Sequence, residues 1–371
     1  MIIWFIFFLV VYVLIHKYGT TSSSQEKKLY IALFLVTIVY FAAFRDGIGT
    51  DYTAYKSYCE RDVLEFGSLL AQEPLAYALE SFCYNTDFSA VIFFLVSSLI
   101  ICTLCTLIYT KYDNAVIALF VFVTYTNLYL SSLNLVRQFV AAAIILYGAY
   151  YYIQKTRSPI FFVFVFLAFL FHKSSVLFVL IYFLRKTEIN PIVWTIIILA
   201  SWIINVQPLF EIPVIKNLLV ISEYQTYISY NETSYSKFSM INLYMHIIVL
   251  LFIWKSNKMS NVKNKDHFYF VLKMTALSVV FSNMSANDLP FAYRYAIFCS
   301  VFIPTLFTYL PNIIDRKLIP MFVYIPLCVV IWAVFFNRQN DRVFCPQQIL
   351  PIESIFDKNY KPYDNPDTIV L

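Results

Sequence analysis

Charge is scarce in this 371-residue sequence. Only 13% of the residues are charged and 60% are apolar, whereas a soluble domain has about 25% charged and 45–50% apolar residues. The deficit excludes a soluble enzyme, a nucleic-acid binder and a small secreted domain stabilised by disulfides. It also excludes a disordered chain, which needs the opposite balance. Because the apolar surplus falls in runs close to the thickness of a bilayer, we expect a polytopic membrane protein.

Glycine is also rare, with five residues in the whole chain. Transporters use Gly-interrupted helices and small-residue helix contacts, so this scarcity disfavours a transporter. The sequence contains no Walker loop, no GxGxxG motif and no Cys/His spacing typical of a zinc site. We therefore expect no nucleotide-binding module, no metal and no cofactor.

The apolar runs predict an all-α bundle of about twelve transmembrane helices, within a range of about ten to thirteen. Several runs are shorter than the roughly 17–25 residues of a spanning helix, so flanking polar residues must complete them. We expect one transmembrane domain over residues 1–336 and an external tail over 337–371. The runs are Ile2–Ile15, Leu29–Phe44, Phe88–Tyr109, Ala115–Leu130, Leu133–Tyr152, Pro159–Phe171, Ser174–Leu184, Pro191–Val206, Met240–Trp254, Phe268–Ser285, Ala292–Leu310 and Leu318–Phe336.

Lysines and arginines in the short loops predict the orientation. If the first run enters from outside, the cytoplasmic loops hold 14 Lys and Arg residues and the external loops between helices hold six. Both termini would then lie outside. One alternative stays open, because residues 159–184 could form one interrupted helix and reverse everything downstream. We prefer two helices that meet at His172 and Lys173, since the reversal would place four lysines of segment 255–265 outside.

Two long loops are predicted on the external side. Loop 45–87 has a net charge of −5, and loop 207–239 is rich in tyrosine and serine. Loops longer than about 12–15 residues are often functional. The tyrosines suit either sugar stacking or an interfacial aromatic belt.

Among the seven cysteines, Cys102 and Cys105 lie within an apolar run and are expected to pack in the core. Cys59 and Cys83 share loop 45–87. A disulfide between them is an open alternative if the outer compartment is oxidising.

Ionisable and polar residues gather at the predicted outer ends of five helical segments. Such residues are costly in or near a membrane and often mark function. Scattered structural charges would divide between the two faces, so their convergence predicts a site just below the outer surface. The residues are Arg45, Asp46, Arg137, Gln138, His172, Lys173, Asp288 and Arg294.

Arg45, Arg137 and Arg294 suit a ligand rich in phosphate, because a guanidinium is always charged and binds phosphate oxygens in pairs. At headgroup depth such a ligand would be a lipid-linked diphosphate. In a glycosyl transfer, arginines can stabilise the charge that develops on the departing diphosphate without a metal. The acceptor hydroxyl needs a base, and four candidates stay open. They are Asp51, His172, Asp46 and Asp288.

Four short motifs, in this order, resemble those of the EpsG-like family, a branch of the Wzy-type bacterial polysaccharide polymerases. Residues 45–55 resemble its Arg-x-x-x-Gly-Thr-Asp-Tyr-x-x-Tyr element, and Arg137-Gln138 resembles its Arg-Gln element. Residues 171–175 are similar to its His-x-Ser element, and Tyr293-Arg294-Tyr295 to its late Arg-Tyr element. The sugar- and diphosphate-binding residues expected on this basis are Arg45, Arg137, Gln138, Lys173, Arg294, Tyr52, Tyr55 and Tyr293.

The resemblance implies a polymerase that joins undecaprenyl-diphosphate-linked oligosaccharide repeat units into O-antigen or capsular polysaccharide. It would act at the periplasmic face of the bacterial inner membrane, in a GT-C-like helical bundle with two long external loops. The expected partners are the lipid-linked oligosaccharides and membrane lipid, with a chain-length regulator protein as an open alternative. Two other functions remain: an O-antigen ligase or similar external transferase, and a flippase of lipid-linked oligosaccharides.

Overall fold

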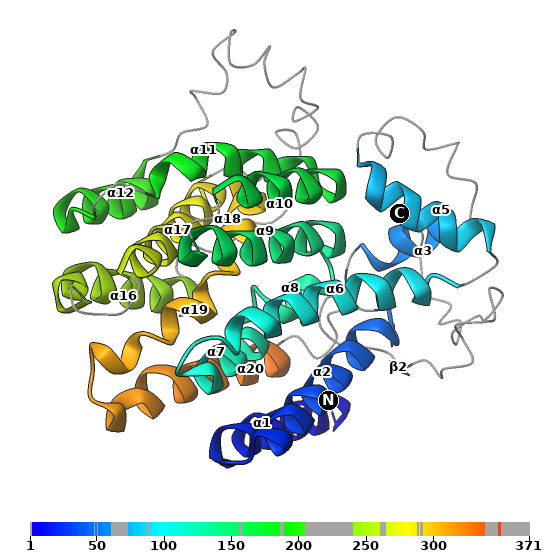
Figure 1. The fold of residues 1–371 in the computed structure, drawn as a ribbon, viewed down its shortest axis with the longest axis horizontal. Helices are drawn as coiled ribbons and strands as arrows, with labels where there is room; N and C mark the ends of the chain where they lie inside the picture. Colours follow the sequence, from blue (N-terminus) through cyan, green and yellow to red (C-terminus); the bar gives the residue numbers. More distant parts are fainter. Residues whose placement is uncertain are drawn as a thin grey trace, which may run out of the picture.

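The computed structural model describes residues 2–47, 49, 51–60, 73–86, 89–155, 158–185, 189–204, 240–259, 265–287, 289, 292–337 and 348–349. These residues are almost entirely helical, apart from one antiparallel pair of two-residue strands (Figure 1). Five described helices are long and apolar enough to cross a membrane, and a sixth span results if the bent pair 292–300 and 303–312 is counted as one. Four shorter apolar helices accompany them. The protein is thus an all-α, multi-pass membrane protein, while the count of twelve spans stays a prediction.

The first two helices form a hairpin. Helix α1 spans Ile2–Thr20 and α2 spans Ser24–Ala43, where the Ser23 side chain accepts a hydrogen bond from the Glu26 amide and caps α2. The ring of Phe7 lies 4.4 Å from that of Phe41, so the start of α1 is beside the end of α2. The N-terminus therefore lies at the end of the bundle where Arg45 follows α2.

A two-residue strand near the C-terminus lies at the same end. Strand β1 is Arg45–Asp46, and it pairs in antiparallel register with β2, Gln348–Ile349. Between α2 and β2 the chain builds the rest of the bundle. Its later members include α16 (Met240–Lys255), α17 (Lys265–Ser285), α18 (Ala292–Ser300), α19 (Ile303–Phe307), a short π-helical segment (Pro320–Tyr324) and α20 (Ile325–Asn337). The start of α1 and strand β2 thus both lie beside the Arg45 segment.

Helix α9, Val136–Lys155, lies at the centre of the packing. It contacts α6 (Val91–Tyr109), α10 (Ser158–Phe171) and α18. Small residues permit this close approach, since a Cβ added at Gly148 would lie 2.4 Å from the Phe164 Cβ of α10. Because α9 begins at the Arg45 end of the bundle, its first turn is held rigidly beside several other helix ends.

Residues 158–184 form two antiparallel helices, as the sequence analysis preferred. Helix α10 ends at Phe171, a 3-10 turn follows over Lys173–Val176, and α11 covers Leu177–Leu184. The ring of Tyr182 near the end of α11 lies 4.6 Å from that of Phe162 near the start of α10. One continuous helix would separate these rings by about 30 Å. His172 therefore lies at the tip of a hairpin.

Two helices cover the end of the bundle at which α9 begins (Figure 1). Helix α3 spans Tyr52–Glu60 and α5 spans Pro74–Asn85, and the two pack against each other and lie near α6 and α10. Both come from the predicted external loop 45–87. This part of the loop is therefore a folded layer that brings its acidic residues to the helix ends. The second predicted loop, 207–239, lies outside the described residues.

Candidate functional site

Helix α5 presents one buried face to the bundle. Its buried residues Glu73, Ala76, Glu80 and Cys83 recur at intervals of three and four, the spacing of one helix face. Proline is at the first position, where its missing N–H costs nothing. Glu73 precedes it as the N-cap, but its carboxylate makes no capping hydrogen bond. Its carboxylate instead turns towards the neighbouring helices.

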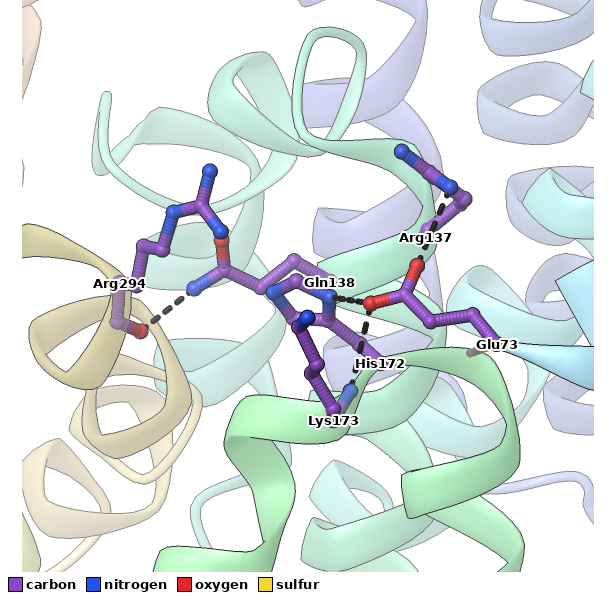
Figure 2. A network of polar contacts seen from close by, with 6 residues as sticks. All are labelled: Glu73, Arg137, Gln138, His172, Lys173 and Arg294. Atoms are coloured by element: carbon purple, nitrogen blue, oxygen red, sulfur yellow. Dashed lines mark hydrogen bonds and ion pairs between the residues drawn. The ribbon is translucent and has the colours of Figure 1, made fainter. Parts of the chain in front are cut away.

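The Glu73 carboxylate joins two segments distant in sequence (Figure 2). Its Oε1 atom lies 2.6 Å from His172 Nδ1 and accepts a hydrogen bond from the Lys173 backbone N–H at 3.3 Å. Its Oε2 atom lies 3.1 Å from Arg137 Nη1. Glu73 is only 5% exposed, so this is a buried carboxylate with a histidine on one side and an arginine on the other.

The environment of Glu73 favours its ionised form. Burial alone would raise the pKa of this carboxyl group, but the hydrogen bond with His172 and the electrostatic interactions with His172 and Arg137 outweigh it. The pKa of Glu73 therefore lies below its ordinary value. An ionised Glu73 accepts hydrogen bonds only, so His172 Nδ1 is the donor.

That arrangement fixes the tautomer of a neutral His172. With the proton on Nδ1, the lone pair is on Nε2. Nε2 is buried, and among the described residues no hydrogen-bond partner reaches it. The ring also stacks on Phe298 of α18, with 6.0 Å between centroids and 10° between planes. The result is an oriented imidazole whose basic nitrogen has no partner in the described part of the chain.

The first turn of α9 connects this group to α18. Gln138 follows Arg137, is 4% exposed, and its side-chain amide donates a hydrogen bond to the backbone carbonyl of Arg294. The Arg294 side chain is partly exposed. Gln138 therefore fixes the position of the residue that carries the second guanidinium of the site (Figure 2).

Arg45 occupies a different setting. It is 2% exposed, and its terminal nitrogens donate to the carbonyls of Ala42 and, at 2.7 Å, Leu133. Its guanidinium carbon lies 4.2 Å from the ring centroid of Phe94. In this structure Arg45 ties the end of α2 to the segment before α9, and a substrate would have to displace these contacts to reach it.

The two glycines after Arg45 form a turn that rests on the same segment. Gly47 and Gly49 have φ values of 66° and 96°, which glycine adopts without strain. A Cβ at Gly49 would lie 2.9 Å from Asn134 Oδ1, and this oxygen accepts a hydrogen bond from the Asp51 backbone N–H at 2.9 Å. The close approach that the glycines permit is thus to the protein itself. Asp51 is half-buried at the start of α3.

Tyr52 and Tyr55 on α3 pack inside this layer. Tyr52 stacks on Phe94 at 5.1 Å and its hydroxyl is hydrogen-bonded to buried Asp46. Tyr55 stacks on Phe93 at 5.1 Å, and its ring centroid lies 5.7 Å from the Arg137 guanidinium carbon. Both tyrosines are 5% exposed, and their buried rings pack against the guanidinium groups of Arg45 and Arg137.

Glu80 is the second acid on the buried face of α5. It is 0% exposed, and among the described residues neither carboxylate oxygen has a hydrogen-bond partner. Burial raises the pKa of Glu80 to about 7, with Glu73 adding to the rise and Arg137 opposing it. One helix thus carries an ionised carboxylate and, two turns later, a carboxyl that holds its proton up to neutral pH.

Cys59 and Cys83 lie beside this acid as free thiols. Both are 0% exposed and are hydrogen-bonded to each other. They connect α3 to α5 without the disulfide that the sequence analysis left open. Cys102 and Cys105 are buried in the core, as expected.

The structure brings together most of the predicted site residues. Arg137, His172 and Lys173 meet at Glu73, and Gln138 meets Arg294. Tyr293 is partly buried against the main core. Asp288 lies outside the described residues.

Sequence reasoning counted Glu73 and Glu80 only in the charge of loop 45–87 and missed their part in the cluster. The spacing of residues 73, 76, 80 and 83 around a helix-starting proline at position 74 was the signal that could have found them. Among the described residues, no group of three or more His, Cys, Asp or Glu side chains is arranged to hold a metal ion.

A family model described as the EpsG family matches residues 27–354, which is most of the chain and includes all the predicted site residues. The chain belongs to the EpsG family. The resemblance found in the four short motifs is confirmed, and family membership indicates a polysaccharide polymerase type of role in general. No curated protein and no solved structure matches the chain. The GT-C-like arrangement of the EpsG-family protein therefore stays a prediction.

Proposed function

We propose that the protein joins oligosaccharide repeat units carried on undecaprenyl diphosphate into a longer polysaccharide, at the periplasmic face of the bacterial inner membrane. The observation that carries the proposal is the Glu73–His172 pair flanked by Arg137. In this arrangement we propose His172 as an oriented base and Arg137 as the group beside it that binds phosphate. Membership of the EpsG family supports the polymerase class.

His172 is the proposed base. The acceptor hydroxyl of the next lipid-linked unit attacks the anomeric carbon of the growing glycan and forms a new C–O bond. Its proton passes to Nε2 of His172, which Glu73 holds in the required tautomer. The ionised Glu73 also stabilises the imidazolium that results, as a carboxylate does in other histidine dyads.

The arginines act on the leaving group. As the bond from the anomeric carbon to the diphosphate oxygen breaks, the electron pair stays on the diphosphate. Arg137 and Arg294 are the proposed donors to its oxygens, because preformed guanidinium groups stabilise charge where it develops. The diphosphate needs no proton to leave, so one base suffices. Asp51 and Asp46 serve structural roles in this scheme.

The predicted topology supports the location. The positive-inside rule predicts that the helix ends that carry these residues face outside, and in the structure the start of α1, strand β2 and the site share one end of the bundle. Tyr112 lies just after the end of α6, and His267 lies in the first turn of α17, both on the predicted lysine-rich side. The Tyr112 hydroxyl is hydrogen-bonded to His267 at the opposite end of the bundle.

The test is the glycan length profile of cells that lack the gene and carry plasmid-borne variants. Wild-type protein should restore a ladder of long chains. Arg137→Ala and Arg294→Ala should leave single repeat units, while the variants remain in the membrane at normal amounts. Long chains from both variants would contradict the assignment of the site. Single units that become attached to a lipid-A core only when the wild-type protein is present, without chain growth, would identify a ligase instead.

A further inference from the structure

Glu80 is a buried acid that the proposed reaction does not use. It is fully buried, and no hydrogen-bond partner for its carboxylate oxygens exists among the described residues. A buried carboxylate without a hydrogen-bond donor is costly, and the cost falls when the group takes up a proton. Glu80 lies on the same buried face as Glu73, which pairs with Arg137 at 3.1 Å, so the charge state of Glu80 affects the electrostatic environment of Arg137.

Among the described residues, the charged groups that face Glu80 are few. On its own helix is Glu73, and across from it on α9 is Arg137. Its own helix also carries the Cys83 thiol and α3 carries the Cys59 thiol, which are hydrogen-bonded to each other. Helices α6 and α10, which also pack against α5, have no charged side chain. Glu80 therefore interacts mainly with the one arginine that also pairs with Glu73.

One carboxylate beside Arg137 orients the guanidinium and balances its charge, but a second would make the group net negative. An anion is attracted to the site by the sum of the nearby charges, and this attraction is strong where water is excluded. A neutral Glu80 leaves Arg137 balanced by Glu73 alone. An ionised Glu80 adds a negative charge that repels a diphosphate.

We propose that the proton on Glu80 sets the affinity of the Arg137 site for its anionic substrate. This inference rests on the proposed function, because it takes a lipid-linked diphosphate as the anion. Glu80 acts through Arg137 and does not touch the reacting atoms. Protonated Glu80 gives the binding form of the protein, and ionised Glu80 gives a weakly binding form. Its raised pKa places the change near neutral pH.

The experiment measures binding of farnesyl diphosphate, a soluble prenyl diphosphate, to the purified full-length protein by calorimetry between pH 5.5 and 8.5. Wild-type protein should bind about tenfold more weakly at the alkaline end, with a midpoint near pH 7. Glu80→Gln, which stays neutral, should keep tight binding over the whole range. Glu60→Gln is the matched control, since Glu60 on α3 is paired with Lys56 at 3.8 Å and its side chain is 29% exposed. It should follow the wild-type profile.

Each result decides the matter. A wild-type profile that does not weaken with rising pH would overturn the inference without any variant. The same alkaline loss in Glu80→Gln as in wild type would also overturn it, and would leave the proposed function intact. No binding by wild-type protein at any pH, with farnesol as the neutral control, would instead count against the proposed function. A purely structural role for Glu80 would change unfolding with pH but not affinity.

Discussion

Two buried histidines of this protein are equally exposed, but one pairs with a charged carboxylate and the other has only neutral hydrogen-bond partners. His172 and His246 are each 8% exposed. His172 pairs with the charged Glu73, and among the described residues its Nε2 atom has no partner. His246 lies on α16, and both of its ring nitrogens have neutral partners. Nδ1 is 2.6 Å from the Asn242 carbonyl and Nε2 is 3.0 Å from Asn283 Nδ2.

The His246 cluster holds three helices together. Asn283 on α17 donates to His246 and, at 3.0 Å, to Ser201 Oγ on α12 (Pro191–Ile203). Asn287 extends it through a 2.8 Å hydrogen bond to the Ser201 carbonyl. Buried polar groups that satisfy one another in this way make the packing of a bundle specific.

The contrast shows how a histidine in a candidate functional site can be distinguished from a buried histidine that only holds helices together. The neutral cluster uses both histidine nitrogens for helix contacts, which leaves none for a substrate. The charged cluster orients its histidine through one nitrogen and leaves the other without a described partner. It also holds acids whose environments push their pKa values in opposite directions, a pattern typical of acid–base sites.

The largest expected effect tests this contrast directly. His172→Gln should lower polymer formation about 100-fold or more, since a positioned general base contributes about 10²–10⁴. His246→Gln should leave polymer formation within a few-fold of wild type, because no step is assigned to it. Both are measured by glycan ladders in cells lacking the gene, normalised to protein in the membrane. Equal losses in the two variants would remove the distinction between the clusters.

The second prediction tests the raised pKa of Glu80 through the pH dependence of folding stability. The pKa of Glu80 is raised from 4.5 to about 7 in the folded protein. Below about pH 4.5 Glu80 is protonated in both the folded and the unfolded state, so its contribution to the stability of the folded protein is fully present. As the pH rises through 7 that effect is lost, at a cost of about 3 kcal/mol.

Glu80→Gln cannot ionise and avoids this loss. Its thermal unfolding temperature in detergent should exceed that of wild type at pH 8, and the two should converge near pH 4.5. Glu60→Gln is the control with no expected divergence. Wild-type and Glu80→Gln curves that stay parallel from pH 4.5 to 8 would show that Glu80 keeps an ordinary pKa.

The smallest effect concerns the neutral cluster. Asn283→Ala removes the donor to His246 and Ser201. It should destabilise the folded protein by about 1–3 kcal/mol, the cost of leaving buried polar groups without partners. Polymer formation per folded molecule should not change. An altered pH profile of activity in this variant would show instead that the two clusters are coupled.

Much of the site could be predicted because its parts are local sequence features. Arg137-Gln138 and His172-Lys173 lie where apolar runs begin or end, and such positions reach the membrane surface together. The hairpin at His172 followed from the lysine distribution. The role of Arg45 was harder to predict, because the carbonyls that it binds become neighbours only when α2 packs beside the segment before α9.

The partner of His172 could not be predicted. Glu73 is 99 residues away from it, in a loop with seven other acids of the same chemical type. To select Glu73 among the eight acids of this loop, one must know the direction of α5 and which of its faces packs against the bundle. Asp51 and Asp46 were open alternatives to His172 as the base, and in the structure the Asp51 backbone and the Asp46 side chain are used for local contacts.

The sequence by itself determined that the protein is helical, crosses the membrane several times and sorts its few charges to the helix ends. These are sums over local composition, and burial in lipid leaves few alternatives. Only the tertiary structure decided that Glu73 is ionised while Glu80 holds its proton. The reason is that a pKa depends on desolvation and on neighbouring charges, and here Arg137 and His172 become neighbours of Glu73 only because α5 packs beside α3, α6 and α10.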